Sequence, residues 1–144
     1  MASGYRAPVD RKEAIRRLAS ARVGHLATAD LGSLPHVVPV VFAVAGETIY
    51  WAVDQKPKGT RDLKRLRNIE ANPNVQLEAD HYEEDWSRLW WVRITGHART
   101  VEDEDEVDSA LDALAQKYPQ YRADPPEGPV VAIDIARVTA WESS

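Results

Sequence analysis

The sequence predicts an α+β protein that is mainly β, in which about six antiparallel strands close into a barrel beside three helices. β-rich apolar stretches recur along the chain and are separated by short turns rich in Gly, Pro and Asp. Apolar residues follow a helical spacing in only three segments. A chain of 144 residues suits one domain with its own core. We therefore expect a single domain over residues 1–144, with a flexible stretch at 1–9.

The first half of the chain begins with a helix and continues with strands. A helix is expected over 10–20, because Asp10 is a good N-cap, and Glu13 three residues later suggests a capping box. Three β-rich stretches follow, at 22–29, 35–44 and 47–54. Their short turns predict an antiparallel meander. Pro39, inside the second stretch, marks a bulge, a sheet edge or a place where a ligand replaces a neighbouring strand.

The second half repeats the alternation of helix and strand. Thr60 is the expected N-cap of a second helix that runs to about residue 71 and is ended by Asn72-Pro73. Apolar and polar residues alternate over 74–82, which predicts a half-buried strand. The remaining elements are a long strand near 88–101, a helix at 102–118 with an acidic first turn, and a last strand at 130–141.

Composition excludes several classes of protein and site. The chain has no cysteine, so disulfides, thiolate nucleophiles and Cys-bound metals are absent, as is usual for a cytoplasmic protein. It has no apolar run long enough to span a membrane and no apolar leader at its start. A net charge of −5 argues against nucleic-acid binding. Its four histidines lack metal-binding spacing and no GxSxG motif occurs, so we expect neither a metal site nor a catalytic side chain.

The strongest functional signal is a basic segment at residues 56–67. It holds six basic groups and one acid, a local charge of +5 against −10 for the rest of the chain. Lys56 and Lys58 fall in a loop after a strand, and Thr60 and Arg61 fall at the start of the next helix. Cations, a hydroxyl and helix N-terminal amides together form an anion site suited to phosphate. The alternative is a basic helix face that is simply solvated.

Five tryptophans form a second signal. Trp90 and Trp91 are adjacent on an expected strand, so their side chains face opposite sides of the sheet. One can fill the core while the other meets a partner or a flat ligand. Core packing and a dimer interface account for most of the five, which leaves one or two for a ring-shaped cofactor.

Three stretches, in this order, resemble those of a known family. They are VGHLATADLGSLPHVVPVVF with its Gly turn, KPKGTRDLKRLRNIEANPNVQLEAD with its basic loop, and RLWWVRITGHARTVED with its G-x-A ending. The set resembles the split-barrel flavin- and deazaflavin-binding proteins related to pyridoxamine 5′-phosphate oxidase. Within that family the chain is most similar to the actinobacterial branch of probable coenzyme F420-dependent enzymes. The likeness extends from about residue 10 to residue 141.

The resemblance implies a six-stranded FMN-binding split barrel and a homodimer with two cofactors at its interface. The positions that match phosphate-binding ones are Lys58, Thr60 and Arg61, with Lys56 as a contributor. The strand whose backbone meets the ring corresponds to Val38, Pro39 and Val40, and Trp51 lies near the ring. Candidates to reach the partner subunit's cofactor are Trp86, Trp91 and Arg93. Gly59 stands where family members often carry another basic residue.

The function that this resemblance implies is hydride transfer between reduced F420 and a small organic substrate of unknown identity. F420 carries a phosphodiester and a polyglutamate tail, and the basic segment is longer than one phosphate requires. Two alternatives on the same fold are an FMN-dependent oxidoreductase and a non-catalytic carrier of F420, haem or another tetrapyrrole. Because the chain ends soon after the last strand, we do not expect pyridoxamine phosphate oxidation itself.

Overall fold

The computed structural model describes residues 9–53 and 63–143 of the chain. Its helices are α1 (Arg11–Ser20), α2 (Lys64–Ala71), α3 (Glu104–Lys117) and α4 (Pro119–Ala123), with a 3₁₀ turn, η1, at Trp86–Arg88. Its strands are β1 (Gly24–Ala29), β2 (Pro35–Val40), β3 (Ala43–Ala45), β4 (Thr48–Ala52), β5 (Asn74–His81), β6 (Trp90–Thr100) and β7 (Val130–Glu142). Within these residues, no helix is long and apolar enough to cross a membrane.

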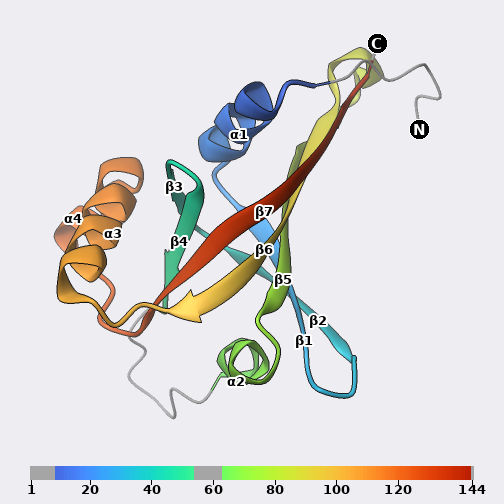
Figure 1. Cartoon of the computed structure of the whole chain (residues 1–144). Coiled ribbons are helices and arrows are strands. Elements are labelled where there is room, and N and C mark those ends of the chain that lie inside the picture. The colour runs from blue at the N-terminus through green and yellow to red at the C-terminus, as the bar shows by residue number, and fades with distance from the viewer. Residues whose placement is uncertain (1–8, 54–62, 144) are drawn as a thin grey trace.

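The seven strands form one curled sheet (Figure 1) in the order β2-β1-β5-β6-β7-β4-β3. Every pair of neighbouring strands is antiparallel. The two longest strands, β6 and β7, form the spine of the sheet, and a bulge lies at Thr95/Gly96. The predicted mainly β, antiparallel split-barrel fold is therefore confirmed, although the described part has seven strands and four α-helices in place of six and three.

The additional strand arises because the predicted strand 35–44 is two strands. β2 and β3 occupy opposite edges of the sheet, and the chain crosses between them at Phe42, which is fully buried. The Phe42 amide donates to the Tyr118 hydroxyl (3.2 Å), and the Lys117 amine donates to the Phe42 carbonyl (2.9 Å). These side chains replace a strand partner, so the expected meander is wrong after β2. Pro39 does lie on an edge strand, as predicted.

The helices begin for reasons that the sequence shows only in part. The Asp10 carboxylate caps α1 through the Lys12 amide, as predicted, but Glu13 bonds Arg16 and Arg17 in place of closing a capping box. α2 begins at Lys64, because the backbone of Leu63 before it is extended, with φ −83° and ψ 146°. The predicted N-cap, Thr60, lies outside the described residues.

α4 lies in a segment that was expected to be a loop. Its Pro119 occupies the first helical turn, where the missing N–H of proline costs nothing. α3 and α4 lie together beside β3 and β4 in Figure 1, where Leu114 and Tyr118 are buried against Ala43. This end of the sheet is thus covered by one more helix than expected.

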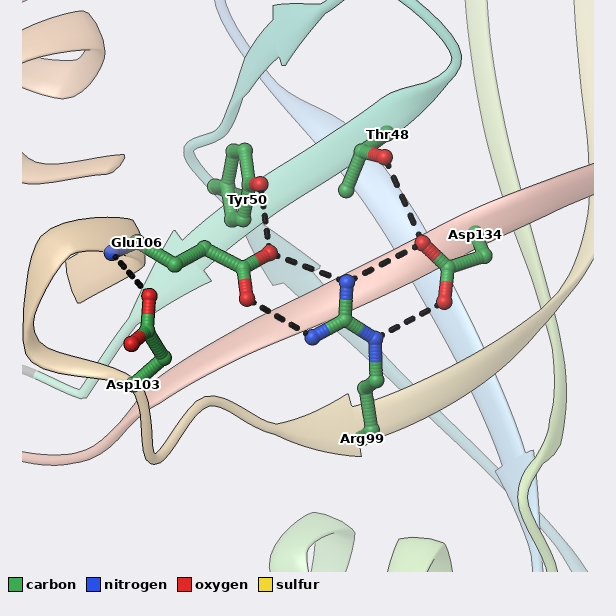
Figure 2. Close-up of polar contacts among 6 residues, drawn as sticks. All are labelled: Thr48, Tyr50, Arg99, Asp103, Glu106 and Asp134. Atoms are coloured by element: carbon green, nitrogen blue, oxygen red, sulfur yellow. Dashed lines mark hydrogen bonds and ion pairs between the residues drawn. The ribbon is translucent and has the colours of Figure 1, made fainter. Parts of the chain in front are cut away.

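An ion-pair network attaches α3 to the sheet (Figure 2). The Arg99 guanidinium on β6 donates to Glu106 on α3 (2.9 Å) and to Asp134 on β7 (2.8 Å). Glu106 also accepts from the Tyr50 hydroxyl (2.7 Å), and Asp134 accepts from the Thr48 hydroxyl (3.3 Å). The Arg99 side chain of β6 therefore links α3 to β7, and the two carboxylates that it binds extend the network to β4.

This network should be visible in the titration of Tyr50. Burial, followed by the hydrogen bond to the Glu106 carboxylate, raises the pKa of the Tyr50 phenol to about 12. In the Glu106→Gln variant we expect the pKa of Tyr50 to fall but to stay above 10, because the burial remains. NMR of ζ-¹³C-tyrosine measures each phenol separately. The control is Glu104→Gln, an exposed neighbour on the same helix, and an unchanged Tyr50 pKa in Glu106→Gln would contradict the assignment.

Candidate functional site

β2 combines an open backbone edge with side chains on both sides of the sheet. It pairs only with β1, so its other edge has no strand partner among the described residues. Val38 and Val40 face inward with Leu26, and Val40 is buried. Pro39, which has no amide to donate, points outward and is exposed. An open edge of this kind can offer main-chain groups to the rim of a flat ligand.

Trp51, on β4, lies inside the barrel. Its side chain is 1% exposed, and its indole Nε1 has no hydrogen-bond partner among the described residues. The Arg65 guanidinium of α2 lies over the Trp51 ring, 5.3 Å from its centroid. A buried N–H without an acceptor costs about 1–3 kcal/mol, so an acceptor supplied by a ligand would stabilise this arrangement.

Arg65 is the residue that sequence reasoning missed. The sequence places it among several cations of the basic segment, with no feature that favours it over Lys64 or Arg67. Only the packing of α2 directs Arg65 to Trp51. A helical wheel through Leu66 and Ile69, which both pack against the core, could have oriented the helix, but it could not have identified Trp51 as the neighbour.

α2 is fastened to the hairpin of β1 and β2, beside which it lies in Figure 1. The Asn68 amide of α2 donates to the Thr28 hydroxyl of β1 (3.0 Å), and both side chains are almost fully buried. Lys64 lies 3.9 Å from the Asp30 carboxylate at the hairpin turn. His36, opposite Thr28 on β2, has a buried Nδ1 without a partner among the described residues. The hairpin, the first turn of α2 and the interior of β4 therefore meet at one end of the barrel.

The predicted phosphate-binding residues lie between β4 and α2 in the sequence, outside the residues that the structure describes. They are Lys56, Lys58, Thr60 and Arg61. Val53, which follows β4, is held by two backbone hydrogen bonds. Its amide donates to the Pro129 carbonyl, and its carbonyl accepts from the Gly128 amide, both at 3.0 Å. The first turn of α2, which holds the last cations of the basic segment, carries no acid.

The partner-directed candidates lie on a different surface. We call the side of β2, β1, β5 and β6 that points away from the core the outer face. Pro39, His25, Glu78 and Arg93 are consecutively opposite one another on these four strands, so their side chains share the outer face. Trp91 shares it too, with the Arg93 guanidinium 5.3 Å from its ring centroid.

Trp86 completes the set of predicted residues. It lies in the η1 turn and is 53% exposed. The predicted site residues that the structure describes therefore fall into two groups on the sheet. The inner group is Val38, Val40 and Trp51, and the outer group is Pro39, Trp91 and Arg93. Because the sheet lies between the two groups, one chain does not bring them to the same side of a ligand.

The inner group fits a phosphorylated planar cofactor. A buried indole N–H lacks an acceptor, a guanidinium lies beside it, and a strand edge is open. No cluster of metal-ligating side chains occurs in the described ranges 9–53 and 63–143. The buried N–H, the guanidinium and the open strand edge are together suited to binding an anion and a ring.

Comparison with known proteins agrees with the fold. The family model of pyridoxamine 5′-phosphate oxidase matches residues 10–144. A FAD-binding protein from Mesorhizobium loti is similar in fold, with a TM-score of 0.74 and 22% identity over 98% of this chain and 100% of that chain. The haem storage protein HutZ from Vibrio cholerae gives a TM-score of 0.70 and 15% identity over 88% and 92%. No curated protein sequence matches the chain.

Proposed function

The chain belongs to the pyridoxamine 5′-phosphate oxidase family, and from this premise we propose that it is an F420-dependent oxidoreductase. The deazaflavin would supply the hydride that is exchanged with a small organic substrate. The protein's contribution is to bind and orient the coenzyme and to exclude water from its ring. The observation that carries the proposal is the cationic junction at the start of α2, where Arg65 lies over the buried Trp51.

Each part of the coenzyme has a counterpart in the chain. We propose that Lys56, Lys58, Thr60 and Arg61, with Arg65, hold the phosphodiester, since guanidinium and ammonium groups form charge-assisted hydrogen bonds to phosphate oxygens. The open edge of β2 at Val38, Pro39 and Val40 is suited to the rim of the ring. The length of the basic segment supports F420 over FMN, because the polyglutamate tail adds negative charge.

We propose further that two copies of the chain form a homodimer through their outer faces. This face carries the exposed apolar residues Val37 and Pro39 beside charged groups of both signs. In such a dimer, Trp86, Trp91 and Arg93 of one copy would reach the cofactor held by the other. The division of the predicted residues into inner and outer groups is the observation that supports a shared site.

A binding titration tests the cofactor assignment. We expect F420 to quench the tryptophan fluorescence of the purified protein with a Kd at least tenfold lower than that of FMN. The physical reason is the tail, whose carboxylates gain from the +5 segment. Tighter binding of FMN would assign the protein to the flavin-dependent alternative. Binding of neither, together with a Soret band on addition of haem, would favour the carrier alternative, for which the similarity to haem proteins is the motive.

A further inference from the structure

The outer face of the sheet is uncovered in the described part of the chain. Outward side chains of β2, β1, β5 and the adjoining half of β6 are exposed or half-buried, and none is buried. The helices pack elsewhere: α1 and α2 contribute Leu18 and Ile69 to the main core, and α3 contributes Leu114 beside β3. Val37 is 61% exposed near the middle of β2. Apolar surface of this kind on an uncovered sheet favours association.

A pair of carboxyl groups lies near the centre of this face. Glu78 and Asp80 are two residues apart on β5, so they point the same way, and their side chains are hydrogen-bonded to each other. Two carboxyl groups can form such a bond only when one of them carries a proton. Burial and then this bond raise the pKa of Glu78 to about 7, so the pair holds a proton near neutral pH.

The charged groups that face Glu78 come from both neighbouring strands. On β1, the His25 Nδ1 lies 3.7 Å from the Glu78 carboxylate. On β6, Arg93 is directly opposite Glu78 and lowers its pKa, though less than burial and Asp80 raise it. Arg93 is also held over the Trp91 ring. The cluster therefore combines carboxyl groups with basic side chains, so the face can pair opposite charges with its own two-fold copy.

We propose that the outer face is the docking surface for a second copy of the chain, and that docking takes up a proton on each Glu78–Asp80 pair. This inference rests on the homodimer proposed above and adds that its formation depends on pH. Docking removes the remaining water from the pair, and a carboxylate loses more solvation than a neutral carboxyl group does. Protonation therefore lowers the free-energy cost of forming the interface, and the dimer tightens as pH falls.

The size of the effect follows from the number of protons taken up. One proton for each copy changes the dimer Kd by at most about a hundredfold per pH unit. The change is confined to pH values between the pKa of the pair in the free chain, about 7 for Glu78, and its raised pKa in the dimer. Below the first value both states already hold the proton, and above the second neither does. We expect a Kd at least tenfold lower at pH 6.0 than at pH 8.5.

Sedimentation equilibrium of the full chain without cofactor at these two pH values tests the proposal. Glu78→Gln is expected to form a dimer whose Kd differs less than threefold between the two, because its side chain stays neutral. The control Glu70→Gln removes an exposed carboxylate of α2, away from the face, and should behave like the parent. His25→Gln should retain most of the pH dependence, which separates the carboxyl pair from the imidazole.

The position of the interface is tested with Val37→Lys. This side chain is exposed, so the change leaves the fold intact but should weaken the dimer at least tenfold at both pH values. An unchanged Kd in this variant would place the interface elsewhere and overturn the proposal. A parent dimer whose Kd is the same at both pH values, or lower at pH 8.5, would overturn the proposed proton uptake but not the dimer itself. A parent that is monomeric throughout would overturn both, and neither result bears on the F420 titration.

Discussion

Replacing Lys58 and Arg61 together by alanine is expected to weaken F420 binding by at least a hundredfold. A hydrogen bond to a charged group contributes about 1.5–3 kcal/mol, and a difference of about 1.4 kcal/mol is tenfold in Kd. Two cations that both contact phosphate would therefore account for more than a hundredfold change. Titration of the parent and variant proteins by cofactor fluorescence at constant ionic strength measures it.

The matched control for this double variant is Arg11→Ala with Lys12→Ala. It removes the same charge from α1, which lies at the opposite end of the molecule from α2 in Figure 1. We expect its affinity for F420 to stay within threefold of the parent, because charges separated by more than a Debye length of about 8 Å are largely screened. Equal losses in the two variants would show that the basic segment acts only through net charge, and would contradict a specific phosphate site.

Gly96→Ala is expected to lower the free energy of unfolding by about 2–4 kcal/mol, through overpacking at a rigid backbone. A Cβ at this position would lie 2.5 Å from the Asp134 carbonyl oxygen and 2.7 Å from the Ile133 side chain on the neighbouring strand. The carbonyl is backbone inside the longest strand pair of the sheet, so it cannot move away alone. Chemical denaturation of the two proteins measures the difference.

Gly32→Ala serves as the control for this prediction. In the hairpin turn of β1 and β2, a Cβ at residue 32 would meet only the Asp30 carboxylate, at an ordinary 3.4 Å. We expect its stability to stay within about 0.5 kcal/mol of the parent, as for most surface substitutions. If Gly96→Ala proves equally mild, the strand pair must yield at its bulge, and the close approach would not explain the glycine. A large loss of stability in Gly96→Ala would instead show that close packing requires the glycine of the G-x-A sequence.

Much of the fold could be predicted because local patterns and tertiary packing agree. The alternation over 74–82 placed Val75, Leu77 and Ala79 on one face, and all three are buried in β5. His81 follows the same alternation but is exposed, at the last residue of β5. Period-2 patterns identify a strand and its faces, but they do not show where the neighbouring strand ends.

The split of the strand 35–44 could not be predicted, for a related reason. The stretch is apolar and β-rich throughout, so its composition favours one continuous strand. The break at Phe42 depends on Lys117 and Tyr118, which are more than seventy positions away in sequence and supply the hydrogen bonds that a neighbouring strand would have made. Such partners become visible only when the chain is folded.

The sequence by itself determined the family, the mainly β antiparallel architecture and the cations of residues 56–67, since these depend on composition, periodicity and ordered motifs. For Pro39 it left a bulge, an edge and a ligand site open, and the strand order decided for the edge. Only the tertiary structure decided that Arg65 lies over Trp51 and that Arg93 lies opposite Glu78 on the outer face. These juxtapositions depend on strand order and helix orientation. Both are set by long-range packing of the core, and no local pattern of residues encodes them.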